Sequence, residues 1–259
     1  MHNRHVAGSL SALIVGAVFL IFAPPASAQE SSAEQISRLK KAVVIVTTYD
    51  DRGKPLLQGS GFFVDSDQVA TNFHVIKDAS QIRVETFNRT VSTVTTILAT
   101  DEKSDLALLQ LDSSSPQLTV LCLKTTAPAE GDSVTVISNP QGAHWKVTRG
   151  STGLLWEFQG LGERLQITAA ISAGSSGGPV LDARGEVVGI ATMYFNSIEN
   201  LSFAVPVERL QALQLKALNA QAREAGARVE PRVERSGTLG SLAENPSEPA
   251  KRATHLLFQ

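Results

Sequence analysis

The sequence predicts an all-β fold, a sandwich or a barrel, with two sets of strands and one helix after the second set. Three observations lead to this prediction. Short runs rich in Val, Ile, Thr and Phe recur through residues 41–206, Gly, Asp, Asn and Ser separate them, and helix-forming residues follow Pro206. Many short strands at close spacing are typical of sandwiches and barrels, whereas alternating βα units would need longer helical segments.

The first set of predicted strands follows a polar leader at residues 29–36. Its runs are KAVVIVTTY (41–49), GSGFFVD (59–65), QVATNFHVI (68–76), QIRVETF (81–87), VSTVTTILAT (91–100) and LALLQLD (106–112). The polar patch DSSSPQ (112–117) comes next. We interpret this patch as the crossing between two β units.

The second set has the same style, without a convincing internal repeat. Its runs are LTVLCLK, DSVTVIS, KVTRGST, LQITAAI, GPVLDA, EVVGIATMYF and LSFAVP. DARGE (182–186), between two apolar runs, is typical of a tight hairpin turn. Residues 207–225 predict a helix that ends at Gly226, because apolar residues recur on one face. These residues are Val207, Leu210, Leu213 and Ala217.

The two ends of the chain differ in composition from the middle. Residues 1–28 contain Arg4, the fourteen-residue apolar run LSALIVGAVFLIFA and the small residues Ala26-Ser27-Ala28, which is the layout of a secretory signal peptide. Fourteen residues are short for a membrane span of about 20. We therefore expect cleavage after Ala28, a periplasmic or secreted protein, and no stable membrane insertion. Residues 226–259 are mostly polar and predict a disordered tail.

Composition excludes several functions. The net charge of −2 over 259 residues gives no basic field for nucleic acid. The five histidines are scattered and no Cys/His pair has zinc spacing, so we expect no metal and no cofactor. Cys122 is the one cysteine, which excludes an intramolecular disulfide, and its apolar neighbours predict a buried side chain. We expect His144 and Trp145 in a surface loop.

The stretch SAGSSGGPV (172–180) places two adjacent serines among three glycines. A serine hydroxyl becomes a nucleophile only beside a base, and that base needs an orienting acid. Backbone N–H groups must also face the oxyanion that forms on attack. Glycine permits the unusual dihedrals and close substrate approach that this requires. Taken alone, the stretch fits a nucleophile and an ordinary glycine-rich turn equally well.

Residues 174–179, Gly-Ser-Ser-Gly-Gly-Pro, resemble the G-x-S-G-G-P motif of trypsin-like serine proteases. ATNFHVIKDA (70–79) and DEKSDLALLQLD (101–112) resemble the histidine and aspartate segments of that family, in the same order. The resemblance implies two antiparallel six-stranded β-barrels, with His74 and Asp105 in the first and Ser176 in the second. The active site would lie between them. Without this context, His74 would be read as a structural histidine and Asp105 as a cap or solvated acid.

The resemblance also assigns roles. His74 would be the general base, Asp105 its orienting acid and Ser176 the nucleophile, with the backbone N–H groups of Gly174 and Ser176 as the oxyanion hole. The substrate pocket would come from the stretches 169–172 and 192–194, which contain no Asp or Glu. A preference for Lys or Arg before the scissile bond is therefore disfavoured, and the resemblance favours small or medium aliphatic residues. The candidate pocket residues are Ala170, Ile171, Thr192 and Met193.

Seven motifs follow the order of the bacterial HtrA/Deg branch and cover roughly residues 40–215: GSGFFVD, TNFHVI, SDLALLQLD, GDSVTVISNPQG, AISAGSSGGPV, EVVGIATMYF and LSFAVPVERL. This resemblance implies a serine endopeptidase acting on unfolded or damaged polypeptides. Trimers are common in that branch, so a homo-oligomer would fit, although no residue pattern here establishes one. Only Gly226 to Gln259 follow the predicted helix, too few for the PDZ domain usual in the branch, so we do not expect PDZ-based regulation.

Two other interpretations fit parts of the sequence. Residues 174–178 also match G-x-S-x-G of α/β-hydrolases, but that fold places its histidine after the serine. Only His255 follows here, and βα alternation is missing. The second alternative is a catalytically silent or chaperone-like binding protein on a protease scaffold. A fluorophosphonate probe separates it from an enzyme, because the probe labels an active nucleophile.

Overall fold

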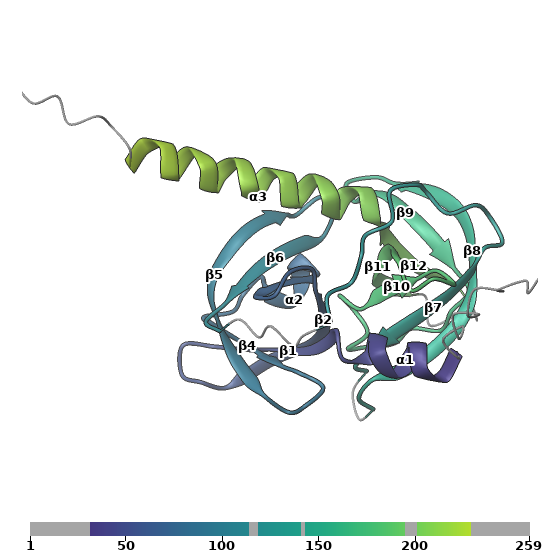
Figure 1. Ribbon diagram of the computed structural model, residues 1–259, viewed down its shortest axis with the longest axis horizontal. Helices are drawn as coiled ribbons and strands as arrows, with labels where there is room; N and C mark the ends of the chain where they lie inside the picture. The colour runs from purple at the N-terminus through teal and green to yellow at the C-terminus, as the bar shows by residue number, and fades with distance from the viewer. Residues whose placement is uncertain (1–31, 114–118, 141–142, 195–200, 229–259) are drawn as a thin grey trace, which may run out of the picture. The chain divides into compact units, whose positions relative to one another are not determined.

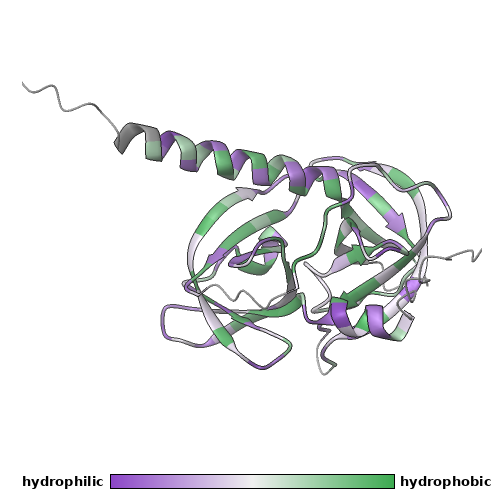
Figure 2. Ribbon diagram, viewed as in Figure 1, coloured by the Kyte–Doolittle hydropathy of each residue, from purple (hydrophilic) through white to green (hydrophobic). Residues whose placement is uncertain are grey.

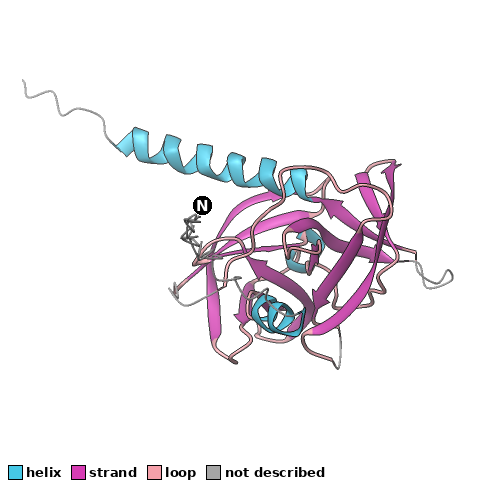
Figure 3. Ribbon diagram, turned by 45° about the vertical axis from the view of Figure 1, so that its right-hand side comes forward, coloured by secondary structure: helices cyan, strands magenta, loops and turns pink. Residues whose placement is uncertain are grey.

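Two closed barrels of six antiparallel strands make up the computed structural model, which describes residues 32–113, 119–140, 143–194 and 201–228 (Figure 1). The strand order is β1-β2-β3-β6-β5-β4 in the first barrel and β10-β11-β12-β9-β8-β7 in the second. Strands dominate the described chain (Figure 3). The all-β prediction and its two six-stranded barrels are confirmed. The predicted signal peptide and most of the predicted tail lie outside the described residues.

The first barrel begins after helix α1 (Ser32–Lys40) and includes one short helix, α2 (Phe73–Ile76), which follows β3. Its strands are β1 (Val43–Tyr49), β2 (Pro55–Phe63), β3 (Gln68–Thr71), β4 (Gln81–Glu85), β5 (Val91–Asp101) and β6 (Leu106–Leu111). Two of these elements differ from the prediction. The polar leader is partly helix α1, and the run QVATNFHVI turns from strand into helix α2 after residue 71.

The second barrel follows the connection that contains DSSSPQ, and helix α3 (Val207–Arg228) begins directly after its last strand. Its strands are β7 (Ser133–Ser138), β8 (Lys146–Phe158), β9 (Gly162–Ile167), β10 (Pro179–Leu181), β11 (Val187–Tyr194) and β12 (Ser202–Pro206). The described part of LTVLCLK is not a strand, and Leu123 forms an isolated bridge with Val187. β8 is longer than its predicted run KVTRGST.

Strand β1 contributes side chains to two hydrophobic clusters. Successive side chains of a strand point to opposite faces. Val44 and Val46 therefore fill the first barrel, while Val43 and Ile45 belong to a cluster that also contains residues of the second barrel and of α3. All four side chains are buried, which accounts for the uninterrupted apolar run in this strand. Apolar stretches are visible along the strands of both barrels (Figure 2).

The start of α3 packs as the sequence predicts. Val207, Leu210, Leu213 and Ala217 are at most 3% exposed, so the predicted apolar face is confirmed. The predicted end is wrong, because the helix continues through Gly226 to Arg228. Glycine within a helix costs only about 1 kcal/mol relative to alanine, which does not by itself end a helix. No helix in the described part of the chain is long and apolar enough to cross a bilayer.

Two burial predictions are wrong. Cys122 is exposed, because its neighbour Leu121 takes the inward position and the side chain of Cys122 points the other way. Trp145 is buried, whereas His144 is exposed as expected. The indole N–H of Trp145 donates to the Val43 carbonyl at 2.9 Å, which ties the second barrel to β1. Its distance along the chain from Val43 hides this contact from local sequence analysis.

The predicted DARGE turn is confirmed and is organised by Asp182. Its carboxylate accepts the N–H groups of Arg184 and Glu186, each at 2.9 Å, and the Lys124 ammonium at 3.0 Å. Burial raises the pKa of Asp182, but the hydrogen bonds and the Lys124 charge outweigh it. The pKa therefore lies below its ordinary value of 3.8.

Replacing Asp182 with alanine should lower the free energy of unfolding at pH 7 by about 2–4 kcal/mol, because Lys124 would be left unpaired while only 16% exposed. A carboxylate whose folded pKa is depressed stabilises fully above its unfolded pKa of about 3.9, and this contribution is lost as pH falls through the folded pKa. Urea unfolding should show the deficit at pH 7 and a smaller one below pH 4. Asp51→Ala, at an exposed position, is the control, and equal stability of the Asp182 variant and wild type at pH 7 would contradict the account.

Candidate active site

Segments from both barrels bring together the three residues predicted for catalysis. His74 lies on α2, Asp105 in the turn between β5 and β6, and Ser176 in the loop between β9 and β10. The His74 ring atom Nδ1 is 2.8 Å from Asp105 Oδ2, and the His74 backbone N–H donates to Asp105 Oδ1 at 2.9 Å. This carboxylate therefore holds both the ring and the backbone of the histidine.

Asp105 adopts a strained backbone conformation. Its φ of 58° falls in the left-handed region that non-glycine residues seldom occupy. The Asn72 side-chain amide donates to the Asp105 carbonyl at 2.8 Å, and the Asp105 N–H donates to the Glu102 carbonyl at 3.2 Å. Such conformations persist where the surroundings enforce them, and they cluster at functional sites.

Thr192 connects the acid to the serine. Its hydroxyl donates to Asp105 Oδ2 at 2.7 Å, and its carbonyl accepts the Ser176 hydroxyl at 3.2 Å. Within the described chain Ser176 has no hydrogen bond to His74, so the hydroxyl must leave the Thr192 carbonyl before it can donate to the imidazole. Catalytic hydrogen bonds are often loose in substrate-free structures and tighten on binding. Sequence analysis placed Thr192 in the substrate pocket and missed its bond to Asp105.

The backbone conformation of the loop that carries Ser176 depends on its glycines. Gly174 and Gly177 have φ values of 91° and 88°. A Cβ on Gly177 would overlap the Ser60 carbonyl, so this position requires glycine. Ser60 also anchors the loop, since its N–H donates to the Ser176 carbonyl and its hydroxyl to the Gly174 carbonyl, each at 2.8 Å. The N–H groups of Gly174 and Ser176 have no acceptor among the described residues, which leaves both able to bind an oxyanion.

Similarity to known proteins identifies the family of the chain. Residues 59–190 match the family model described as a trypsin-like peptidase domain. The chain belongs to the trypsin-like peptidase family. This peptidase domain also matches the crystal structure of the serine endoprotease from Yersinia pestis, with a TM-score of 0.65 and 30% identity, over 73% of this chain and 67% of that one.

Two curated relatives of this peptidase illustrate its similarities. It is 34% identical over 184 residues to the anti-sigma-I factor RsgI9 of Acetivibrio thermocellus, covering 71% of this chain and 26% of the relative. It is 34% identical over 164 residues to a probable periplasmic serine endoprotease, DegP-like, of Rhizobium meliloti, covering 61% and 32%. Relatives named as HtrA or DegP-like proteases confirm the resemblance to that branch. The chain spans about a quarter to a half of the length of these curated relatives.

The two adjacent serines of this peptidase have different surroundings. Ser175 is 2% exposed, and its hydroxyl oxygen lies 3.1 Å from the Ser138 hydroxyl and accepts the Ser172 N–H at 3.2 Å. Ser176 is half-buried. Ser175 therefore orders the loop from within, while Ser176 is the more accessible of the two serines.

A cavity of about 750 Å³ lies beside the predicted base and its predicted orienting acid. His74 and Asp105 line it, and among the described side chains Thr192 is the one predicted pocket residue in its wall. Ala170 is exposed and Ile171 packs against the core of the second barrel. The Met193 backbone lies in β11, and its side chain lies outside the described residues. The rest of the wall consists of Phe73, Lys77, Glu102, Lys103, Gly160, Leu161 and Arg164.

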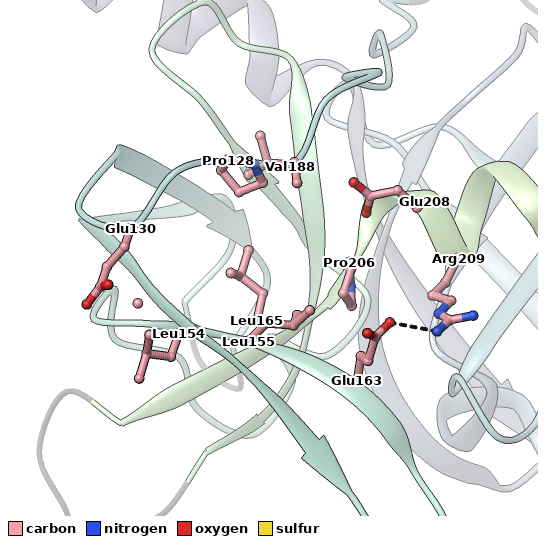
Figure 4. A pocket seen from close by; sticks show the side chains of 12 residues that line it. Pro128, Glu130, Leu154, Leu155, Glu163, Leu165, Val188, Pro206, Glu208 and Arg209 are labelled. Carbon is pink, nitrogen blue, oxygen red and sulfur yellow. Dashed lines mark hydrogen bonds and ion pairs between the residues drawn. The ribbon is translucent and has the colours of Figure 1, made fainter.

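A second cavity of about 530 Å³ lies elsewhere in the peptidase and is more apolar (Figure 4). Leu154, Leu155 and Leu165 line it, and the ion pair between Glu163 and Arg209, at 2.7 Å, crosses its wall. It shares no lining residue with the cavity of His74. Sequence analysis predicted neither this cavity nor the presence of Arg164 beside the active site.

Proposed function

We propose that the chain is an exported serine endopeptidase, with Ser176 as nucleophile, His74 as general base and acid, and Asp105 as orienting acid. One observation carries the proposal. A single carboxylate binds the His74 ring and its backbone N–H, and the same carboxylate is joined through Thr192 to Ser176. Membership of the trypsin-like peptidase family supports the same chemistry.

The geometry supports a defined sequence of proton transfers. Ser176 leaves the Thr192 carbonyl, gives its proton to His74 Nε2 and attacks the substrate carbonyl. The oxyanion accepts the free N–H groups of Gly174 and Ser176. The imidazolium then protonates the leaving amine, and water hydrolyses the acyl-enzyme by the reverse transfers. Asp105 keeps the proton on Nδ1 throughout and stabilises the imidazolium.

The proposal also includes a substrate class and a cellular location. The layout of residues 1–28 supports export to the periplasm or beyond, and three relatives carry the word periplasmic in their names. The HtrA/Deg resemblance supports unfolded or damaged polypeptides as substrates. A small or medium aliphatic residue before the scissile bond fits the absence of Asp and Glu from the stretches 169–172 and 192–194.

Digestion of a reduced, unfolded protein by the purified exported chain tests the proposed function. We expect internal cleavage, with most new carboxyl termini at aliphatic residues, as read by mass spectrometry of the products. A Ser176→Ala preparation controls for contaminating proteases. Dominant cleavage after Lys or Arg would overturn the preference alone. Suppression of aggregation without any cleavage would overturn the endopeptidase and support the chaperone-like alternative.

A further inference from the structure

Arg164, in β9, is a buried cation without an ion pair. Its side chain is 1% exposed. One terminal nitrogen donates to the Glu163 carbonyl at 2.9 Å and the other to the Lys103 carbonyl at 3.4 Å, while Nε has no partner. No carboxylate among the described residues lies within salt-bridge distance of it. Arginine is almost never fully buried unless it is paired, because removing a charge from water is costly.

Side chains along β9 alternate between two cavities, and Arg164 lies on the side of the candidate active site. Side chains of a strand alternate between two faces. Glu163 and Leu165 line the apolar cavity (Figure 4), whereas Arg164 between them lines the cavity that contains His74 and Asp105. Arg164 therefore belongs to the same cavity wall as His74 and Asp105.

The charges around this cavity leave Arg164 without a counter-ion. The Glu102 carboxylate lies 3.4 Å from the Lys77 ammonium. Both oxygens of Asp105 already accept hydrogen bonds, from His74 and Thr192. The Lys103 side chain, also in the wall, has no partner among the described residues. Arg164 and Lys103 thus line the cavity, and neither forms an ion pair with a carboxylate of the described residues.

Burial lowers the pKa of Arg164, and the more distant charges of Asp105 and Asp101 partly offset this effect. A guanidinium nevertheless stays protonated in proteins. Arg164 itself therefore stays cationic at every pH at which the chain is folded. A cation in a partly desolvated wall interacts strongly with an anion that enters the cavity.

We propose that this wall is a subsite for an acidic side chain of the substrate, bound by Arg164 with help from Lys103. Arginine is suited to this role because its planar group can bind a carboxylate through two parallel hydrogen bonds. The cavity, at about 750 Å³, has room for such a side chain beside His74 and Asp105. The inference rests on the proposed function, since it names a substrate feature of the same site.

Matched peptides test the subsite without any change to the protein. Each peptide carries one glutamate or one glutamine at a chosen position within three residues of a common cleaved bond. At one position, we expect kcat/KM for the glutamate peptide to exceed that for the glutamine peptide at least tenfold, and the ratio to fall at high salt. Equal rates for both peptides at every position would overturn the subsite.

Variants then assign the preference to Arg164. Arg164→Gln should reduce the glutamate-to-glutamine ratio to less than about twofold, and Arg164→Lys should retain part of it, because the charge remains and the bidentate geometry is lost. Arg83→Gln, an exposed arginine on β4, removes the same charge away from the cavity and should leave the ratio unchanged. An equal loss on both peptides in Arg164→Gln would contradict the subsite and indicate a purely structural role in holding the Lys103 carbonyl.

Binding separates failure of the subsite from failure of the proposed function. Fluorescence anisotropy measures the Kd of both peptides for Ser176→Ala protein, in which cleavage is not needed. Tighter binding of the glutamate peptide that depends on Arg164, without cleavage by wild type, would support the subsite and overturn the endopeptidase. Cleavage of both peptides at equal rates would support the endopeptidase and overturn the subsite.

Discussion

Ser176→Ala should lower kcat on an unfolded protein by about 10⁴-fold or more, while the thermal unfolding midpoint stays close to that of the wild type. The substitution removes the nucleophilic oxygen. It removes only one hydrogen bond among the described residues, to the Thr192 carbonyl, so the fold loses little. Initial cleavage rates and circular dichroism melts of the two proteins give both quantities.

The structure also determines which serine serves as a control. Ser175→Ala is the control that the sequence suggests, but the buried Ser175 hydroxyl holds the loop, so its loss would disturb the same site. Ser133 is exposed on β7, and its side chain makes no hydrogen bond in the described chain. Ser133→Ala should therefore cleave at the wild-type rate. A Ser176→Ala protein that keeps more than about a tenth of wild-type activity would contradict the assignment of the nucleophile.

Asp105→Asn should lower kcat by about 10⁴-fold, through a different physical cause. The amide has the size of the carboxylate but presents an N–H group, so it no longer keeps the proton on His74 Nδ1 and cannot stabilise the imidazolium. The variant should still fold, because the Asn72 bond to the residue 105 carbonyl does not involve the side chain. Steady-state kinetics on one peptide measure the loss.

An exposed acid close to the same helix controls for a general charge effect. Asp78 follows α2, is exposed and has no side-chain bond within the described residues. Asp78→Asn removes the same charge and should leave kcat unchanged. If Asp105→Asn lost less than about tenfold, or if both variants lost the same amount, the orienting role of Asp105 would be wrong.

The barrels are predictable from sequence because their signals are local. Apolar runs, period-two burial and turn residues such as those of DARGE mark most strands within a few positions. Helix α2 is different. Its run looks like a strand because β-branched residues flank it, yet the His74 N–H donates to Asp105, 31 positions away. A contact with the turn before the neighbouring strand β6, not local propensity, accompanies the change from strand to helix.

The candidate site also has some features that are predictable from sequence and others that are not. Residue types and their order identify His74, Asp105 and Ser176. The φ of Asp105, the bond from Thr192 and the unpaired guanidinium of Arg164 depend on segments that meet only in the folded chain. Trp145 and Cys122 show the same limit, since each takes its burial from long-range neighbours and not from the composition around it.

Covalent labelling with a fluorophosphonate, followed by peptide mapping, tests most directly whether a hydroxyl, an imidazole and a carboxylate from two barrels act as one unit. The account predicts a single adduct on Ser176 of the folded chain, lost in His74→Ala protein and absent from Ser175. An adduct on another serine, or no adduct on folded protein with or without unfolded substrate, would contradict it.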